Sequence, residues 1–509
     1  MRIKLLCSLV LNCVLATGIA YPQQKSVYPV KRNEDASTWR NDGRAALERA
    51  RNRRFKRKKA KNIILFVGDG MGISTLTAAR ILEGQLRGES GEENTLSFEN
   101  FPFSALSRTY SVNQQIADSA PTMSAIMTGV KTFEGAISVT QNAKPDDYRT
   151  AAGNEAETLL ELAEMNGRST GVISTARLTH ATPAACYSHS VKRGWENDAA
   201  ILGEAPEAHK GGVRDIARQL IEFKYGNGLE VAMGGGRYSF LPETTVDPEY
   251  ASRMGVRKDG RDLTKEWESR YSNSEYVWNK AQFDAVNPLE TDHLLGLFEP
   301  SHMKYEHDRA RDSAGEPSLT EMTVKAIDLL SKNKRGFLLV VEAGRIDHAH
   351  HSGNAYRALT DTIELSNAVR AASGKVDLKK TMIVVTADHS HTLTIGGYSA
   401  RGNNILGLVR DVAASGIPET EPALAKDGKP YTTLGYSNGP GYPAGERPDL
   451  ENSVVLDPDY RQEATVPLGS ETHAGEDVAI FADGVNAWMF SGSMEQNWIY
   501  YIMRDAFRF

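Results

Sequence analysis

The sequence predicts an α/β fold: a mostly parallel central sheet flanked by helices on both faces, in three layers. Unbroken apolar runs are expected of strands buried on both faces, and they occur at residues 63–67, 170–174, 337–341 and 382–386. Between these runs, apolar residues recur with helical spacing at 157–165, 319–331 and 356–372. Strands that alternate with amphipathic helices are typical of a parallel sheet covered on both sides.

Composition and charge are those of an ordinary globular protein. Of the 509 residues, 40% are hydrophobic and 24% are charged, and the formal net charge is -6. A chain of this length can form one large domain with insertions. The negative net charge gives no overall attraction to nucleic acid, so we expect no nucleic-acid-specific binding.

Residues 1–20 have the pattern of a secretory signal peptide. Arg2 and Lys4 precede an apolar run that ends near Leu15, and Ala20 is a small residue suited to cleavage. We therefore expect a secreted or periplasmic protein, cut near Ala20, in which Cys186 is the remaining cysteine. No later stretch approaches the ~20 apolar residues of a membrane span, and the last residues are too charged for a lipid-anchor signal.

Residues 21–60 are predicted to form a polar arm with a helix at 38–50. The stretch from 49 to 61 is strongly basic. One interpretation is a solvated helix end and linker. The other is a patch for anionic surfaces such as lipopolysaccharide. The sequence leaves both open.

One catalytic domain is expected over residues 61–509. Two stretches break its alternation of strands and helices: residues 235–318 are long, polar and rich in aromatic residues, and residues 398–468 are dense in Gly, Pro and Asn. We interpret both as insertions at loops rather than as separate domains.

Acidic residues lie at the ends of three predicted strands. Asp69, Glu342 and Asp388 each stand one or two residues past an apolar run. Ligands in open α/β sheets bind at the carboxyl ends of the strands, so these side chains are expected to converge. For Asp69, which lies between two glycines, a simple turn carboxylate is the alternative.

Two short stretches are rich in histidine. Asp347 and His351 are four residues apart and share a face on a helical turn, and the pair Asp388-His389 directly follows a strand. Imidazole and carboxylate suit zinc, and two metals ~4 Å apart can clamp both oxygens of an in-line displacement. The alternatives are an exposed helix start and a structural pair. His391 is expected to orient a ligand rather than to bind metal.

Ser119 is the candidate nucleophile. It begins a predicted helix at 119–129, where an anion would meet the positive end of the helix dipole. A serine hydroxyl needs a base, a metal or a lowered pKa to attack. Ser119 does not stand in a Gly-x-Ser-x-Gly motif, and no Ser-His-Asp arrangement suggests an acyl-transfer hydrolase, so metal activation is favoured. The alternative is a serine that caps the helix.

These segments resemble the motifs of the alkaline phosphatase family, in order and over nearly the whole chain after the signal peptide. The matching motifs are Val67–Gly72, Asp118–Ala120, His180–Ala184, Val191–Trp195, Glu342–His351, Thr386–His391 and Glu471–Asp477. The resemblance implies hydrolysis of small phosphate monoesters to an alcohol and inorganic phosphate. It also implies a phosphoserine intermediate, two zinc ions and one magnesium ion per chain.

The resemblance implies roles for individual residues. Ser119 would be the nucleophile, and the planar guanidinium of Arg193 would bind two phosphoryl oxygens. The implied ligands are Asp347, His351 and His473 for one zinc, Asp69, Asp388, His389 and the Ser119 oxygen for the second, and Asp69, Thr182 and Glu342 for magnesium.

Around the implied magnesium site, this chain is similar to the animal enzymes of the family. His180 and His348 stand where some bacterial members have Asp and Lys, and with His391 they are expected to surround the metals without binding them. Residues 438–442 resemble a crown loop. A possible calcium site, in which Glu replaces the usual Asp at the last position, is implied at Glu249, Phe298, Glu299 and Glu316. The disulfides and lipid-anchor tail of the animal enzymes have no counterpart, as in a bacterial-type secreted form, and a homodimer is expected from the family alone.

Two other classes of protein are alternatives. A sulfatase motif would need an arginine in the segment 119–123, which has none, and diesterases of the superfamily lack the arginine matched by Arg193. A phosphate- or mineral-binding protein without turnover would share the fold. The sequence favours the enzyme because every residue required for turnover is present.

Overall fold

The structure is a computed structural model that describes residues 25–29, 41, 44–45, 47–48, 55, 57–145 and 147–509. The predicted signal peptide at 1–20 lies outside these residues, and so does most of the predicted arm and helix at 21–60. None of the helices in the described ranges has both the length and the apolar content that a bilayer crossing requires.

Ten strands form the central sheet, in the order β15-β2-β14-β8-β1-β7-β3-β4-β6-β5. From β8 to β5 all neighbouring strands are parallel, whereas β14 runs antiparallel to both β8 and β2. The strands are β1 (Asn62–Gly68), β2 (Phe103–Arg108), β3 (Ser169–Arg177), β4 (Val231–Gly235), β5 (Ser274–Val277), β6 (His293–Leu297), β7 (Phe337–Ala343), β8 (Thr381–Ala387), β14 (Val478–Gly484) and β15 (Ser493–Glu495).

Helices cover both faces because the central strands β1, β7 and β8 are mostly apolar and successive side chains point to opposite faces. In β1, Ile64 and Phe66 enter one buried core and Ile63 and Leu65 enter the other. The first core lies under α2 (Ile73–Leu86), α12 (Leu319–Leu330) and α14 (Ala355–Lys375). The second lies under α3 (Ser119–Thr128), α4 (Leu159–Met165), α5 (Ala181–Tyr187), α8 (Ile216–Ile221) and α16 (Trp498–Phe507).

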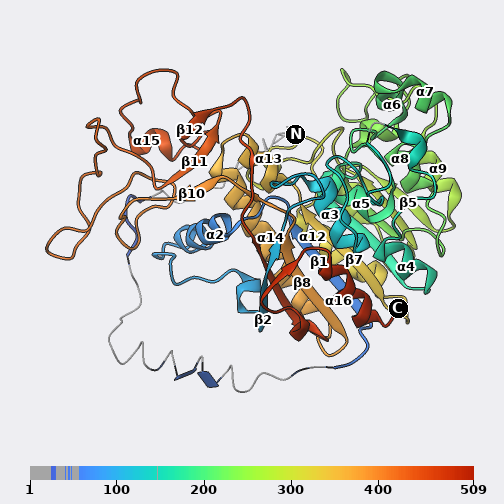
Figure 1. Cartoon of the computed structure of the whole chain (residues 1–509), viewed down its shortest axis with the longest axis horizontal. Coiled ribbons are helices and arrows are strands. Elements are labelled where there is room, and N and C mark those ends of the chain that lie inside the picture. Colours follow the sequence, from blue (N-terminus) through green and yellow to red (C-terminus); the bar gives the residue numbers. More distant parts are fainter. Residues whose placement is uncertain are drawn as a thin grey trace, which may run out of the picture.

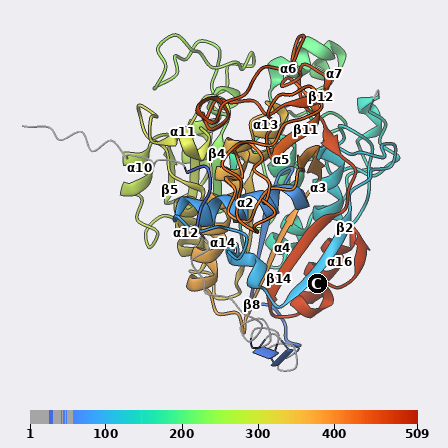
Figure 2. The same ribbon diagram turned by 90° about the vertical axis from the view of Figure 1, so that its left-hand side faces the viewer.

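Figures 1 and 2 show these layers, with α2, α12 and α14 on one side of the sheet and α3 and α16 on the other. The predicted three-layer α/β sandwich is therefore confirmed. The four apolar runs lie within β1, β3, β7 and β8, and the three helical patterns lie in α4, α12 and α14.

The insertion at 235–318 contains regular secondary structure. It contributes β6 and β5, which extend the sheet by two parallel strands beyond β4. β5 is a short polar strand at the sheet edge and carries little of the apolar signal that marks the central strands, whereas β6 is buried but only five residues long. The same part of the chain contains α9 (Leu263–Arg270), α10 (Lys280–Ala285) and α11 (Glu306–Arg309), while α6 (Asp198–Glu204) and α7 (Pro206–Lys210) form an outer lobe in green (Figure 1).

The insertion at 398–468 forms a separate three-stranded sheet with the segment that precedes it. β10 (Leu393–Ile395) pairs with β11 (Leu434–Gly439), which pairs with β12 (Ala464–Pro467), and α15 (Asn452–Val455) lies nearby. This crown-like segment stands to one side of the carboxyl ends of the main strands (Figure 1).

Candidate active site

The carboxyl ends of three adjacent strands bring the acids together. β1 lies between β7 and β8, and Val67 pairs with both Glu342 and Thr386. Asp69 and Asp388 follow directly after β1 and β8. All three carboxylates are buried, as is Asp347 on α13 (Arg345–His351). Burial and the neighbouring charges raise the pKa of Asp388 to about 6 and that of Glu342 to about 8. Clustered buried carboxylates of this kind are stabilised in their charged form by a neighbouring cation.

One group of donors consists of Asp347, His351 and His473. His473 lies in β13 (His473–Ala474), which pairs with β9 (Ser390–His391). The Nε2 atoms of His351 and His473 are 3.2 Å apart, and each is 3.3 Å from Asp347 Oδ1. Four donors placed tetrahedrally ~2.0 Å from zinc are about 3.3 Å from one another. The three atoms therefore have the spacing of one face of such a tetrahedron.

The ring tautomers in this group are fixed by backbone carbonyls. Nδ1 of His351 donates to the carbonyl of Glu471 at 2.6 Å, and Nδ1 of His473 donates to that of Ala117 at 2.9 Å. When the rings are neutral, both Nε2 atoms carry lone pairs. Burial lowers the pKa of His473, but the hydrogen bond with Asp347 outweighs burial and raises it, so without a cation this Nε2 tends to hold a proton. Two lone pairs directed at the same carboxylate cannot hydrogen-bond to one another, and they suit a shared cation.

A second group of donors surrounds the Ser119 hydroxyl. Ser119 Oγ lies 3.2 Å from His389 Nε2 and 3.5 Å from Asp69 Oδ1. His389 Nε2 is also 3.3 Å from Asp69 Oδ1 and 3.4 Å from Asp388 Oδ2. These distances again match the edges of a tetrahedron around zinc. Burial holds the pKa of His389 well below its usual range, so the ring is neutral and can act as a ligand.

The third predicted group lies on the other side of Asp69. Asp69 Oδ2 is 3.5 Å from Thr182 Oγ1, and Ser174 donates to Glu342 Oε2. Glu342 Oε1 is buried without a hydrogen-bond partner. Oxygen donors of this kind suit magnesium, and the orphaned oxygen of Glu342 is available to such an ion.

Ser119 is not the cap of its helix. The N-cap of α3 is Asp118, and Ser119 is the first helical residue, 2% exposed, with its hydroxyl directed at His389 and Asp69. The structure therefore contradicts the alternative of a capping serine.

Arg193 lies beside the nucleophile. Its Nη1 binds the carboxylate of Asp118, and its Nη2 is 2.8 Å from His180 Nε2. Since Arg193 is always charged, His180 accepts through Nε2, and its protonated Nδ1 is buried without a partner. Arg193 is thus held at the site by a carboxylate and an imidazole that flank it.

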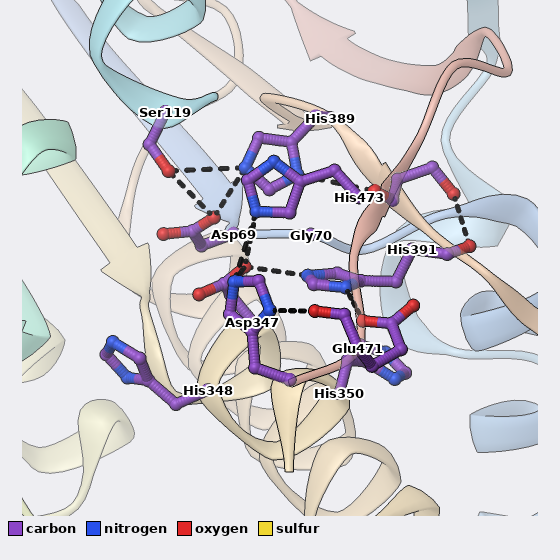
Figure 3. Close-up of polar contacts among 12 residues, drawn as sticks. Asp69, Gly70, Ser119, Asp347, His348, His350, His389, His391, Glu471 and His473 are labelled. Atoms are coloured by element: carbon purple, nitrogen blue, oxygen red, sulfur yellow. Dashed lines mark hydrogen bonds and ion pairs between the residues drawn. The ribbon is translucent and has the colours of Figure 1, made fainter. Parts of the chain in front are cut away.

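His391 connects the acids rather than completing a donor group. Its Nε2 lies 2.6 Å from Asp347 Oδ1 and its Nδ1 lies 2.5 Å from Glu471 Oε2, as the dashed lines in Figure 3 show. Burial opposes its charge, but the two carboxylates outweigh burial and raise the pKa of His391 to about 10. Gly70 allows this approach: its φ is +70°, and a Cβ there would lie 2.3 Å from the His391 ring.

Several residues of the site were not identified from the sequence. Glu471 binds His391, Thr392 and, through its carbonyl, His351. The one sequence feature that pointed to Glu471 is its position in the motif Glu471–Asp477, which resembles the family. His302, from the loop after β6, lies against His348 with ring centroids 4.0 Å apart. His348 is set apart from the donor groups (Figure 3), and no sequence spacing relates it to His302.

Three residues of the predicted calcium site, Glu249, Glu299 and Glu316, lie around Asp312. Glu249 binds Arg237 and Glu299 binds Lys304, while Phe298 is buried in the core and can offer only its backbone. Glu316 Oε2 and both carboxylate oxygens of Asp312 are buried without hydrogen-bond partners. Burial and nearby carboxylates raise the pKa of Asp312 to about 7. The sequence interpretation missed Asp312.

Another acidic cluster is explained without a metal. Asp198, Asp215 and Asp259 converge on Arg257, whose side chain is fully buried and whose guanidinium lies 3.0 Å from Asp215 and 3.7 Å from Asp198. The guanidinium already compensates these charges.

Comparisons with known proteins agree with this geometry. Residues 60–509 match the alkaline phosphatase family. An alkaline phosphatase of Gadus morhua is 44% identical over 476 residues, which cover 92% of this chain and 96% of that protein. The tissue-nonspecific isozyme of Homo sapiens is 42% identical over 503 residues, covering 97% and 92%.

Solved structures share the fold. An alkaline phosphatase of Thermus thermophilus superposes with a TM-score of 0.62 at 22% identity, covering 90% of this chain and 94% of that one. That of the Antarctic bacterium TAB5 gives 0.58 at 20% identity, covering 89% and 99%. The family match and the identities to curated relatives show that the chain belongs to the alkaline phosphatase family and hydrolyses phosphate monoesters.

Proposed function

We propose that this chain hydrolyses phosphate monoesters through a phosphoserine on Ser119, with two zinc ions and one magnesium ion. One observation carries the proposal: imidazole nitrogens and buried carboxylates form two groups with tetrahedral spacing. The first joins His351, His473 and Asp347, and the second joins His389, Asp69 and Asp388 at the Ser119 hydroxyl. That arrangement is unfavourable without cations and suits zinc.

The residues that would hold the metals form three sets that share Asp69. Its Oδ1 faces the donors at Ser119 and its Oδ2 faces Thr182. The sets are Asp347, His351 and His473 for one zinc, Asp69, Asp388, His389 and Ser119 for the other, and Asp69, Thr182 and Glu342 for magnesium. Bound there, the ions would lower the pKa of the serine hydroxyl and neutralise charge on the reacting phosphate.

The protein groups contribute position and charge. Ser119 Oγ forms a bond to phosphorus as the bond from phosphorus to the alcohol oxygen breaks, and water then cleaves the phosphoserine to inorganic phosphate. Arg193, held by Asp118 and His180, binds two phosphoryl oxygens through its planar guanidinium. Positioning and electrostatic stabilisation account for most catalysis in this type of reaction.

The supporting residues keep these groups in place. His391 and Glu471 orient Asp347 and His351, and His180 and His348 lie beside the magnesium set without binding the ion in this proposal. Changing a residue that orients a metal ligand typically costs about 10–100-fold in metal affinity or activity.

A calcium ion is also proposed, at Glu249, the backbone of Phe298, Glu299 and Glu316, with Asp312 as an added ligand. The buried oxygens without partners on Asp312 and Glu316 support it. Calcium prefers several oxygen ligands of this kind. Lys304 and Arg237 already compensate part of the charge, so the affinity is expected to be moderate.

The setting of the enzyme is proposed from its sequence and family. The signal pattern supports a secreted or periplasmic enzyme cut near Ala20, and the family supports a homodimer. The buried free thiol of Cys186 agrees with a mature chain that does not depend on disulfides for stability.

The test combines metal content with a substrate panel. We expect two zinc ions and one magnesium ion per purified chain, and hydrolysis of p-nitrophenyl phosphate that far exceeds hydrolysis of a matched diester or sulfate. A chain without bound metal that still turns over the monoester would refute the metal assignment. Equal rates on the diester would favour the diesterase alternative.

A further inference from the structure

Cations are concentrated at the amino ends of the central strands. The exposed residues there, called the basic face below, are Arg57, Lys58, Lys59, Lys334, Arg335, Lys375, Lys379 and Lys380. They precede β1, β7 and β8, which are adjacent and parallel. Their amino ends therefore share one edge of the sheet, opposite the edge that carries Asp69 and Asp388.

Backbone contacts join these loops into one surface. Lys61 donates its N–H to the carbonyl of Lys380 at 2.7 Å, and Arg168 Nη1 donates to the carbonyls of Lys61 and, at 2.6 Å, Arg335. A cavity of about 460 Å³ opens between the loops, lined by Lys59, Ala60, Lys61, Asn166, Arg168, Arg335 and Phe509. The cations thus form a continuous surface rather than scattered charges.

Most of this charge is uncompensated by acids in the described part of the chain. Lys375 pairs with Asp328 at 2.8 Å and Lys380 with Asp377 at 3.5 Å. Lys58, Lys59, Lys334, Arg335 and Lys379 have no ion pair within 4.0 Å among the described residues. In a protein whose net charge is -6, such a concentration stands out from the rest of the surface.

Aromatic side chains border the same edge. Phe55 is 62% exposed and its ring centroid lies 5.5 Å from that of Trp488, over which Arg57 is also placed. Trp488 is tied to this edge because the neighbouring Asn486 donates to the carbonyl of Lys58 at 2.9 Å. Exposed aromatic rings beside cations are typical of surfaces that contact the headgroup region of a bilayer.

We propose that the basic face docks the enzyme on a membrane surface that carries anionic phospholipid headgroups. Each lysine near such a surface strengthens binding electrostatically, within about one Debye length of the headgroups. In this orientation the carboxyl edge of the sheet, with Ser119, faces away from the membrane. The docked enzyme therefore remains open to small phosphate esters in solution.

Lipid is favoured over nucleic acid by the character of the surface. Nucleic-acid-binding domains are usually basic as a whole, whereas this chain has a sequence pI near 6.1. The cations lie on several short loops at one end of the molecule, beside an exposed phenylalanine ring that a polar duplex would leave unburied.

The test measures binding of the metal-loaded enzyme to vesicles without substrate, so its result does not depend on the proposed reaction. The first variant combines Lys59→Gln, Lys334→Gln and Lys379→Gln, one change in each of the three loops. The matched control combines Lys25→Gln, Lys210→Gln and Lys426→Gln, which are also exposed and lie elsewhere. Vesicles of phosphatidylcholine, with and without phosphatidylglycerol, and a DNA duplex are compared at low and high salt.

We expect the enzyme to bind the anionic vesicles at low salt, to bind neutral vesicles weakly, and to be released by salt. At about five-fold per lysine, the first variant should bind about 100-fold more weakly, with unchanged hydrolysis of a soluble monoester. The control variant should bind like the parent enzyme. Equal losses in both variants, no binding to anionic vesicles at low salt, or tighter binding to the duplex would each overturn the proposal.

Discussion

His351 and His473 place their Nε2 atoms 3.2 Å apart, and because each ring donates its Nδ1 proton to a backbone carbonyl, both Nε2 atoms are acceptors in the neutral rings. The rings come from α13 and from a two-residue strand 122 positions later in the chain. The fold therefore holds two acceptors in contact beside the carboxylate of Asp347, a geometry that a cation would stabilise.

Removal of the metals should therefore weaken the whole fold as well as stop turnover. Ligands that bind only the native state add to its stability, and their loss leaves Asp69, Glu342 and Asp388 facing one another. We expect a chelator to lower the melting temperature by several degrees and to abolish activity, and zinc with magnesium to restore both. An unchanged melting temperature after verified metal loss would contradict this account.

Glu471 should be required for full activity even though it is not a proposed metal ligand. Glu471→Gln removes the charge that holds His391, which in turn positions Asp347. Changes to such orienting residues typically cost about 10–100-fold in metal affinity or activity. The control is Glu476→Gln, an exposed carboxylate that bonds to Ser390 Oγ instead. Titration of zinc affinity in both variants is the measurement, and equal affinities would rule out the positioning role.

Glu164 and Glu230, two buried glutamates, should make the folded state less stable as the pH becomes alkaline. Burial and the charge of Glu230 raise the pKa of Glu164 to about 10. A carboxyl group with a raised folded-state pKa takes up a proton on folding, so its contribution to stability falls as pH rises from about 4.5 towards 10. Glu164→Gln should therefore increase stability between about pH 7 and 10.

The measurement for Glu164 is the melting temperature against pH for the parent enzyme, Glu164→Gln and Glu157→Gln. Glu157 is exposed just before the same helix, so its variant should follow the parent. If the melting-temperature curves of the parent and Glu164→Gln stay parallel between about pH 7 and 10, Glu164 does not titrate as expected.

Arg257 should be essential for stability but not for the reaction. Arg257→Met leaves Asp198, Asp215 and Asp259 without the guanidinium that they share. Loss of one partner of a buried ion pair typically costs about 3–5 kcal/mol. Denaturant unfolding should show this loss, whereas the exposed control Arg253→Met should not. A loss below about 1 kcal/mol would indicate that the acids are protonated or hydrated instead.

The parts of the structure predicted from sequence are those with a strong local signal. The runs in β1, β3, β7 and β8 are mostly apolar and buried, and the acids after β1, β7 and β8 converge because parallel strands end at one edge. β5 and β6 were not identified as strands, since one is polar and the other lies within a long irregular stretch. The pairing of β9 with β13 joins residues about 80 positions apart and has no local signature.

Within the site, the residues that the sequence pattern alone predicts are those with a short-range signal, such as Asp347 and His351 on one helical turn. Glu471, His302 and Asp312 act through tertiary contacts that no spacing reveals. The family resemblance supplied the remaining ligand assignments, Thr182, Arg193 and His473, and the structure brings each of them to the carboxyl edge of the sheet.

The most direct measurement is the position of the phosphoryl group after rapid acid quenching of the enzyme with a monoester substrate. Mass spectrometry of the digested chain should locate one phosphate on the peptide that contains Ser119. Ser119→Ala should lack it, retain zinc and lose most turnover. A phosphate on another residue, or a Ser119→Ala enzyme as active as the parent, would contradict the account.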